Sequence, residues 1–261
     1  MNSKYRDHAT GLPTTARVSC QVVTAGGALK TKEEVIICEK SLEVSVNGVP
    51  VFRLTCTPQH LTELVLGRLC TERIIRSADE VQQLFICGEG NIAEVTLSEN
   101  ITFRPYSGAE PTCCTGNRQL AERVDPVKPE PKPTVNVSPE AVFLLTEKFR
   151  EDGALHRSTG GTHSCYIRFG DGRILSFEDI GRHNALDKAV GAMLLEGADP
   201  SGCMLYTTGR IAADMVTKLT GSGIPVLVSK AVPTEEALRL AKENNITLIC
   251  RAWPDSYTRF N

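Results

Sequence analysis

The chain has 261 residues, a formal net charge of −2, 41% hydrophobic residues and 23% charged residues. This composition is typical of a globular protein with a buried core, and the small net charge argues against nucleic acid or an anionic membrane as the main partner. No apolar run approaches the roughly 20 residues of a membrane-spanning helix, and residues 1–19 lack the apolar stretch of a secretory signal. We therefore expect a cytoplasmic protein whose ten cysteines stay largely reduced.

The first half of the chain is predicted to be rich in strands. Alternating apolar and polar residues mark four stretches: residues 33–39, 42–56, 81–87 and 91–98. Within the second stretch, Asn47-Gly48 favours a two-residue hairpin turn. A helix is expected over residues 57–72, with Thr57 as its N-cap and Pro58 in the first helical position.

A proline-rich stretch at residues 125–140 is the clearest domain boundary. It holds five prolines and alternating charges, a pattern typical of an extended, semi-rigid linker. We expect a β-rich N-terminal domain over residues 1–124, a linker over residues 125–139 and a second domain over residues 140–261.

The second half is predicted to alternate between helices and strands. The predicted helices are residues 139–150, 181–197, 211–223 and 233–245. The predicted strands are residues 163–169, 173–177, 203–208, 224–229 and 246–250. The first two strands should form a hairpin, and the last should be the final strand of the fold. This alternation indicates an α/β domain with a partly parallel sheet that is covered on both faces.

Two adjacent cysteines, Cys113 and Cys114, lie between the last predicted strand of the first half and the linker. Neighbouring residues of a strand point to opposite faces, so two adjacent thiols seldom serve one metal ion or one core. In a connection between domains, one or both thiols can reach solvent and react as thiolates. The alternative is one buried cysteine with an incidental neighbour.

Three glycine-containing corners of the second half carry polar residues that suit an anionic ligand. Thr162 and His163 follow the glycine pair of "STGGTHSC". Arg182 and His183 lie at the start of a predicted helix, and Arg210 stands between a strand and a helix. Helix N-termini and arginines bind phosphate, and ligands gather at the carboxyl ends of strands in open α/β sheets. These corners favour a phosphate-bearing ligand; a glycine turn and a capped, salt-bridged helix start are the simpler alternatives.

Several longer motifs resemble those of one known family. They are "LGRLCTERII", "STGGTHSC", "EDIGRHNALDK", "TTGRIAADMVTKLTGSGIPVLVS" and "PTEEALRLAKENNITLI". From residue 34 onward the chain is similar to the formate dehydrogenase accessory sulfurtransferases, the FdhD/NarQ family. The resemblance implies an α/β fold with a cytidine-deaminase-like, three-layer C-terminal domain, a smaller β-rich α+β N-terminal domain, and a homodimer.

The same resemblance implies a sulfur carrier without a metal of its own. Such a protein accepts sulfur from a cysteine desulfurase as a cysteine persulfide. It transfers the sulfur to molybdenum bis(molybdopterin guanine dinucleotide), the cofactor of formate dehydrogenase. Many family members have two cysteines separated by two residues here, so the adjacent pair leaves open which thiol carries sulfur, with Cys113 as first choice over Cys114.

The resemblance also assigns contacts to the cofactor. It implies that the segment that follows the last predicted strand contacts the guanine dinucleotide, and we expect the three glycine-containing corners to take part in binding as well. The residues of that segment are Arg251, Ala252, Trp253, Pro254, Asp255 and Ser256. Trp253 could stack on a pterin or guanine ring, or simply cover the domain surface.

Three alternative functions fit parts of the sequence. A chaperone that holds the cofactor or the apo-enzyme would need no reactive cysteine. A zinc deaminase would need His-x-Glu and Pro-Cys-x-x-Cys, and the chain has no Cys-x-x-Cys. A dithiol redox protein would need a reversible bridge between Cys113 and Cys114, which the strained geometry of adjacent cysteines disfavours.

Overall fold

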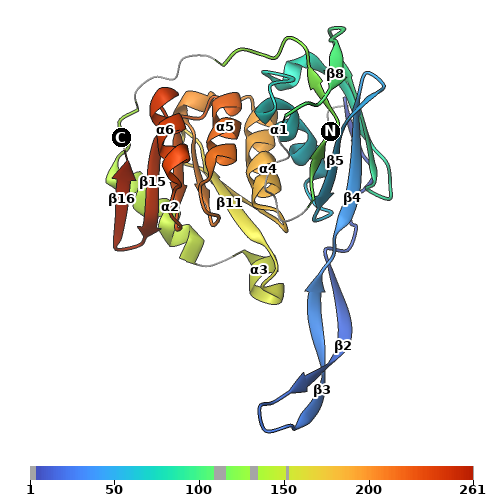
Figure 1. Cartoon of the computed structure of the whole chain (residues 1–261), viewed down its shortest axis with the longest axis vertical. Coiled ribbons are helices and arrows are strands. Elements are labelled where there is room, and N and C mark those ends of the chain that lie inside the picture. The colour runs from blue at the N-terminus through green and yellow to red at the C-terminus, as the bar shows by residue number, and fades with distance from the viewer. Residues whose placement is uncertain (1–3, 109–115, 130–134, 151–152, 261) are drawn as a thin grey trace.

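Two six-stranded sheets, one from each half of the chain, form the body of the protein (Figure 1). The computed structural model describes residues 4–108, 116–129, 135–150 and 153–260. The first sheet has the strand order β1-β6-β7-β4-β5-β9, and the second has the order β12-β11-β13-β14-β15-β16. Both sheets contain parallel and antiparallel neighbours, so this is a mixed α/β protein.

The first sheet forms where the sequence alternates between apolar and polar residues. Its strands are β1 (Tyr5–Asp7), β4 (Lys40–Val46), β5 (Val49–Cys56), β6 (Val81–Ile86), β7 (Ile92–Leu97) and β9 (Arg118–Gln119). The predicted hairpin turn is confirmed, because Asn47 and Gly48 have φ values of 48° and 80°, as a two-residue turn between strands requires. A separate pair joins β8 (Phe103–Pro105) to β10 (Ala121–Arg123).

The first helix starts later than its capping pattern predicts. α1 spans Leu61–Thr71, and its N-cap is His60 in a left-handed conformation with φ 54°. Thr57 is fully buried; its N–H donates to Asp179 Oδ2 at 3.0 Å, and its hydroxyl accepts from the N–H of Ile180 at 3.2 Å. The expectation of Thr57 as N-cap is wrong because this residue instead bonds across to the second half of the chain.

The predicted elements of the second half are present, with additions. The helices are α2 (Pro139–Arg150), α3 (Ala154–Thr159), α4 (Arg182–Leu195), α5 (Ala213–Ser222) and α6 (Glu235–Glu243). The strands are β11 (His163–Arg168), β12 (Ile174–Asp179), β13 (Met204–Thr207), β14 (Val226–Ser229), β15 (Thr247–Trp253) and β16 (Ser256–Phe260). The short α3 has no counterpart in the predicted elements. Residues 246–250 are not the final strand, because β15 runs on to Trp253 and β16 then pairs with it antiparallel.

The second sheet is covered on both faces. On one face, Val142 and Leu145 of α2 pack into a cluster with Tyr166 and Tyr206 of the sheet. On the other face, α4, α5 and α6 contribute to a core that also includes the first sheet. None of the helices in the described ranges is both long and apolar enough to cross a bilayer.

Helices α1 and α4 lie side by side between the two sheets and join the halves of the chain (Figure 1). At the two positions where α1 and α4 come closest, the space admits only glycine. A Cβ on Gly67 would overlap the backbone carbonyl of Asp187, and a Cβ on Gly191 would overlap the backbone carbonyl of Glu63. The close approach lets one hydrophobic core run through both halves.

A long hairpin projects from this body (Figure 1). It consists of β2 (Thr15–Val23) and β3 (Leu29–Ile37), paired antiparallel along their whole length. The sequence pattern predicts only the end of β3 as strand, at residues 33–39. We call residues 15–37 the arm.

The contact between α1 and α4 predicts that Gly191→Ala is strongly destabilising. The added Cβ meets backbone atoms of Glu63 that cannot rotate away, so the helices must separate. We expect the free energy of unfolding, measured by urea denaturation, to fall by about 1–3 kcal/mol or more. Gly26→Ala is the control, because nothing lies within 4 Å of its added Cβ. Equal stability of the two variants would contradict this account of the interface.

Candidate functional site

The carboxyl edge of the second sheet gathers most of the predicted ligand residues. β13 and β14 run parallel and end at Thr207 and Ser229, and the antiparallel β11 begins at this edge with His163. β15 is parallel to β14, so its end brings Arg251 here, where the Arg251 N–H donates to the carbonyl of Ala231 at 2.9 Å. Neighbouring strands thus present polar groups at one edge, where open α/β sheets bind ligands.

A cavity of about 320 Å³ lies at this edge. Its walls come from α3, the glycine pair, the start of β11 and the ends of neighbouring strands: His156, Gly160, Gly161, Thr162, His163, Ser164, Ile180, Thr208 and Lys230. Gly160 ends α3 in the left-handed region, with φ 65°, which favours glycine. The glycine pair therefore turns the chain from α3 into β11 at the cavity wall.

Lys230 on the cavity wall and Arg182 near it carry positive charge. Burial lowers the pKa of His163, and the positive charges of Arg182, His156, Lys230 and His183 lower it further. The positive charges near His163 disfavour its protonated form. A bound anion would be attracted to the same positive charges, so the cavity suits a negatively charged ligand.

Arg182 and His183 occupy the first turn of α4 and share one carboxylate of α5. His183 Nε2 lies 2.9 Å from Asp214 Oδ2, and Arg182 Nη2 lies 3.6 Å from the same oxygen. Burial raises the pKa of Asp214, but the hydrogen bond with His183 and the charges of His183 and Arg182 outweigh it, and the net pKa is lowered. The His183 side chain is only 3% exposed, so it braces α4 against α5. Arg182 passes beside Gly209 at the end of β13 and so borders the ligand edge.

Thr162 supports the cavity wall through its side chain. Its hydroxyl donates to Glu178 Oε1 at 3.0 Å, and its carbonyl accepts from His156 Nδ1 at 2.7 Å. Glu178 also accepts the backbone N–H groups of Leu155 and His156, at 3.0 and 2.8 Å. The carboxylate of Glu178 therefore holds α3 against β12 and fixes the position of the His156 ring.

The other predicted contacts lie at or beyond the same edge. Arg210 is exposed immediately after Gly209. In the C-terminal segment, Ala252 is buried and its carbonyl accepts from the Tyr206 hydroxyl at 3.2 Å. Trp253 is 47% exposed at the end of β15. The remaining members of the segment are exposed or partly exposed: Arg251, Pro254, Asp255 and Ser256.

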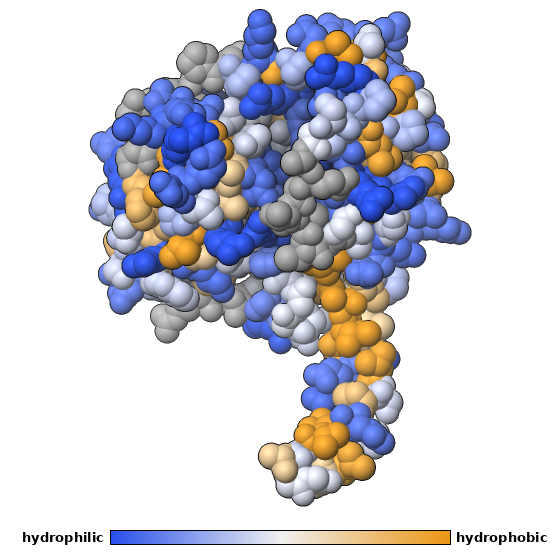
Figure 2. All heavy atoms as spheres, viewed as in Figure 1, coloured by the Kyte–Doolittle hydropathy of each residue, from blue (hydrophilic) through white to orange (hydrophobic). Residues whose placement is uncertain are grey.

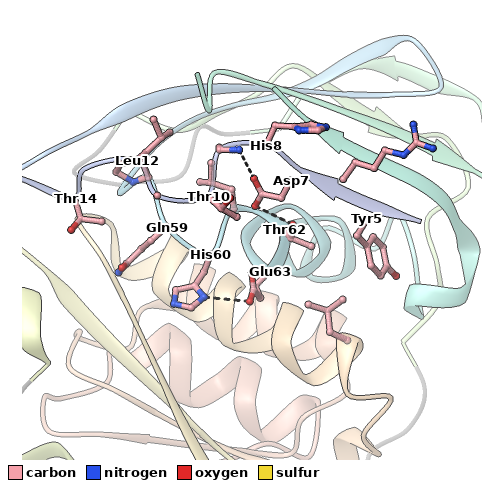
Figure 3. Close-up of a pocket in the computed structure, with 16 residues that line it drawn as sticks. Tyr5, Asp7, His8, Thr10, Leu12, Thr14, Gln59, His60, Thr62 and Glu63 are labelled. Atoms are coloured by element: carbon pink, nitrogen blue, oxygen red, sulfur yellow. Dashed lines mark hydrogen bonds and ion pairs between the residues drawn. The ribbon is translucent and has the colours of Figure 1, made fainter. Parts of the chain in front are cut away.

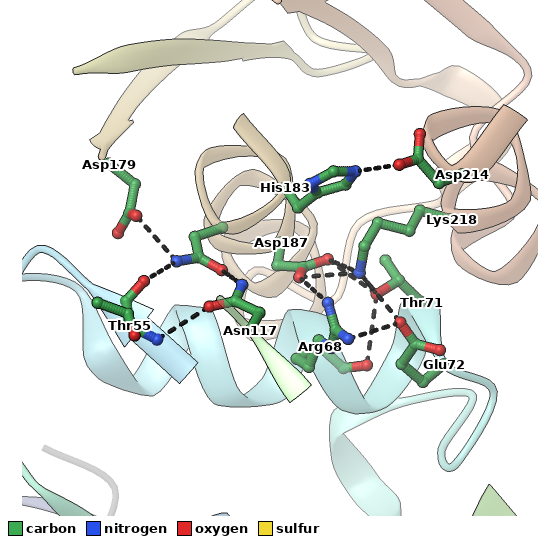
Figure 4. A network of polar contacts seen from close by, with 11 residues as sticks. Thr55, Arg68, Thr71, Glu72, Asn117, Asp179, His183, Asp187, Asp214 and Lys218 are labelled. Atoms are coloured by element: carbon green, nitrogen blue, oxygen red, sulfur yellow. Dashed lines mark hydrogen bonds and ion pairs between the residues drawn. The ribbon is translucent and has the colours of Figure 1, made fainter. Parts of the chain in front are cut away.

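Cys113 and Cys114 lie outside the described residues. The described chain resumes at residue 116, and Asn117 is 3% exposed. Its Nδ2 donates to Asn184 Oδ1 at 2.6 Å, and its Oδ1 accepts from the backbone N–H of Thr55 at 2.9 Å (Figure 4). Asn184 belongs to the first turn of α4, so the chain that follows the cysteines is fixed beside the helix start that borders the cavity.

Several charged residues of "EDIGRHNALDK" serve the interior. Lys218 Nζ donates to both carboxylate oxygens of Asp187, at 2.9 and 3.0 Å, beside Arg68 (Figure 4). Lys188 Nζ lies 2.7 Å from Asp179 Oδ2, and both side chains are fully buried. Each buried charge thus has an opposite partner, which is the condition for burying it at all.

A larger cavity, of about 760 Å³, lies between β1 and the start of α1 (Figure 3). None of the predicted ligand residues lines it. Asp7 accepts from Ala9 N–H and from the Thr62 hydroxyl, and His60 Nδ1 lies 3.3 Å from Glu63 Oε1. Burial opposes ionisation of Glu63, but hydrogen bonding and His60 lower its pKa overall. Two carboxylates on the walls make this cavity less suited to phosphate than the smaller one.

Four polar residues of the smaller cavity are not among the predicted ligand residues: His156, Ser164, Thr208 and Lys230. Lys230 follows the buried strand β14 directly, so the rule on carboxyl ends of strands could have found it. His156 gives no comparable signal, because it belongs to the short α3. Asp214 reaches His183 from a different helix, a contact that local spacing does not reveal.

The carboxylate of Asp214 predicts a pH-dependent stability. Its lowered pKa means that the ionised form favours the folded state. Its contribution is therefore present above the ordinary value of 3.8 and is lost as the pH falls through the lowered value. We expect Asp214→Asn to unfold more easily at pH 7, by about 1–3 kcal/mol, and the difference to shrink below pH ~4. Denaturation at a series of pH values, with the exposed Asp125→Asn as control, measures this; a pH-independent difference would contradict it.

The sequence is similar to that of known proteins over most of its length. Residues 37–261 match the model of the FdhD/NarQ family. The chain is 31% identical over 227 residues to the sulfur carrier protein FdhD of Bacillus subtilis (strain 168), covering 85% of this chain and 87% of the relative. The FdhD sulfur carrier protein of Bacillus pumilus (strain SAFR-032) is 32% identical over 228 residues, covering 85% and 87%.

The fold is also similar to a solved structure. A crystal structure of a candidate formate dehydrogenase accessory protein from Desulfotalea psychrophila superposes with a TM-score of 0.77. The two chains are 24% identical, and the match covers 95% of this chain and 97% of the other. From the extent of the family match and the identity to its relatives, the chain belongs to the FdhD/NarQ family.

Proposed function

We propose that this chain is a cytoplasmic sulfurtransferase that carries sulfur as a cysteine persulfide. It takes the sulfur from a cysteine desulfurase and transfers it to the molybdenum bis(molybdopterin guanine dinucleotide) cofactor of formate dehydrogenase. Membership of the family and the names of the relatives support the carrier role. The cytoplasm suits this role because thiols stay reduced there.

The main structural support for this proposal is the hydrogen bond that holds the chain just after the two cysteines near the cavity. Asn117 is bonded to Asn184 in the first turn of α4, and Ile180 just before that helix lines the cavity. Cys114 and Cys113 precede Asn117 by three and four residues. An extended chain of that length spans at most about 11 or 14 Å. Covalent geometry alone therefore keeps the backbone of either cysteine within that distance of Asn117.

The acceptor's phosphates match the charges of the edge. Lys230 and Arg182 offer fixed positive charge, and His163 lies among them on the cavity wall. Arg210 and Arg251 extend the positive edge, and Trp253 offers an exposed ring on which a guanine or pterin can stack.

Sulfur loading is a thiol–disulfide type of exchange. The carrier thiolate attacks the terminal sulfur of the desulfurase persulfide; one S–S bond forms, the old one breaks, and the desulfurase thiolate leaves. Positive charge near the carrier cysteine favours its thiolate form. In the transfer, the S–S bond of the carrier persulfide would break, the carrier cysteine would leave as a thiolate, and the reduced metal centre of the acceptor would supply the two electrons that convert the terminal sulfur to sulfide.

We also propose the organisation that the family resemblance implies. Residues 1–124, 125–139 and 140–261 are the N-terminal domain, the linker and the cofactor-binding domain, and the chain forms a homodimer. Helices on both faces of the second sheet support a cytidine-deaminase-like, three-layer arrangement for the last of these.

Loading with sulfur tests the carrier role directly. After incubation with a cysteine desulfurase and cysteine, we expect the mass of the protein to rise by one sulfur atom and to return on reduction. Cys113→Ala and Cys114→Ala, made singly, identify the carrying thiol, and the double variant should neither load nor support formate dehydrogenase maturation.

Cys87→Ala is a stringent control for this experiment. Burial opposes ionisation of Cys87, but backbone N–H groups of residues 89–92 outweigh it and lower the thiol pKa, so Cys87 is a competing nucleophile. We expect this variant to load normally. If the Cys113 and Cys114 double variant still matures the dehydrogenase, the chain is instead a chaperone for the cofactor or the apo-enzyme.

Guanosine diphosphate, as the nucleotide half of the cofactor, tests the acceptor site. Lys230→Met removes a charge from the cavity, and we expect the dissociation constant measured by calorimetry to rise by about tenfold or more. Lys242→Met removes an exposed lysine at the end of α6 and should leave the affinity unchanged. Equal affinity in both variants would place the nucleotide elsewhere.

A further inference from the structure

His156 of α3 is held through one ring nitrogen, and its other ring nitrogen has no partner in the described chain. The Nδ1 atom lies 2.7 Å from the carbonyl oxygen of Thr162. A carbonyl oxygen only accepts hydrogen bonds, so Nδ1 carries the hydrogen of the neutral ring and Nε2 keeps a lone pair. Within the described ranges, no hydrogen bond or ion pair reaches Nε2. The partly exposed ring lines the cavity together with Thr208 and Lys230, so Nε2 is available to a ligand there.

The carboxylate of Glu178 fixes the position of this ring. Glu178 is 8% exposed, and it accepts the backbone N–H groups of Leu155 and His156 and the hydroxyl of Thr162. It thereby holds both the backbone that bears the ring and the residue whose carbonyl binds Nδ1. Gly153 leaves room for the carboxylate, because a Cβ at that position would overlap it. The ring is thus held in one orientation before any ligand binds.

The charged groups around α3 favour an anion near the ring. The charged and titratable groups of the neighbouring elements are Arg157 on α3 itself, His163 of β11, Glu178 of β12, Arg182 of α4 and Lys230 at the end of β14. Three donors already satisfy the carboxylate among them. β3 also packs against α3, with Ile37 next to Gly161, and Figure 2 shows hydrophobic residues where the arm joins the body. The two glutamates of β3 form their ion pairs within the arm itself.

We propose that His156 binds a phosphate of the nucleotide at this edge, and that the binding adds one proton from solvent to Nε2. This inference rests on the proposed function, which assigns the guanine dinucleotide to this edge. A phosphate oxygen repels the lone pair of a neutral Nε2 but accepts a hydrogen bond from the protonated ring. Because Nδ1 already carries a hydrogen, Nε2 is the ring atom that takes the added proton. The imidazolium then donates through Nδ1 to Thr162 and through Nε2 to the phosphate.

His163, the other histidine on the cavity wall, is less suited to this role. Burial and the neighbouring positive charges lower its pKa. Its Nδ1 lies 3.4 Å from the hydroxyl oxygen of Thr208, which already accepts the N–H of Ser164 at 3.2 Å. The hydroxyl hydrogen of Thr208 is therefore free to point at His163 Nδ1, an arrangement that requires the neutral ring. Of the two histidines, His156 is the one held ready to take up a proton.

His156→Asn separates anchoring of the ring from binding of the ligand. The asparagine amide can still donate to the Thr162 carbonyl in place of Nδ1, but it has no counterpart of Nε2. Calorimetry of guanosine diphosphate in buffers of different ionisation enthalpy counts the protons taken up on binding. At pH ~7.5 the terminal phosphate of the nucleotide, with a pKa of about 6, is already ionised. We expect the wild-type chain to take up about half a proton per nucleotide, and His156→Asn close to none.

The affinity should change with pH in the same direction. We expect the dissociation constant of the wild-type chain to rise about threefold to tenfold from pH ~6.5 to pH ~8, because the protonated fraction of an ordinary histidine falls over this range. His156→Gln, whose longer amide reaches the place of Nε2, should bind more tightly than His156→Asn but without proton uptake. His8→Asn is the control and should behave as the wild-type chain, because His8 is exposed and does not line this cavity.

Either of two results would overturn the assignment: binding by the wild-type chain without proton uptake, or proton uptake that His163→Asn removes and His156→Asn does not. Should His156→Asn prove unstable in urea denaturation, His156→Gln and the proton count of the wild-type chain decide the question. A wild-type chain that binds no nucleotide would refute the acceptor site of the proposed function together with this inference. Binding without proton uptake would refute the inference alone, and persulfide loading reports separately on the carrier function.

Discussion

The buried carboxylate of Asp179 ties the two halves of the chain to each other and to the start of α4. It accepts from the N–H groups of Thr57 and Gly181 and from Asn184 Nδ2, and it pairs with Lys188 at 2.7 Å. A fully buried charge is tolerated only when such partners satisfy it. Thr57 comes from the first half and the other partners from the second, so separation of the halves would cost the carboxylate one of its hydrogen bonds.

The close packing of α1 against α4 also joins the two halves of the chain. Gly67 and Gly191 let α1 and α4 touch through their backbones, and this contact brings Asp187 between Arg68 and Lys218. Close packing and charge compensation therefore support each other. The start of α4 is held in place by these contacts. The hydrogen bond from Asn117 to Asn184 attaches the chain that follows the cysteines to this helix.

At the start of α4, one motif contributes residues both to the interior and to the edge of the second sheet. In "EDIGRHNALDK", the acidic residues and Lys188 stabilise the interior, and Arg182 borders the ligand edge. At the edge of the second sheet, residues from α3 and α4 and from the end of β14 lie near one cavity. The arm projects away from this edge of the sheet (Figure 1).

Sequence alone determined the hairpin turn at Asn47-Gly48 and the order of helices and strands in the second half, because both follow from local conformational preference and hydrophobic period. It also identified the polar corners at Thr162–His163 and Arg182–His183. Only the tertiary structure decided that Thr57 bonds to Asp179 instead of capping α1, that β16 follows β15, and that His156 and Lys230 share a cavity with His163. These contacts join residues far apart in the chain, and burial and charge pairing select them only once the two sheets and the helices between them have packed.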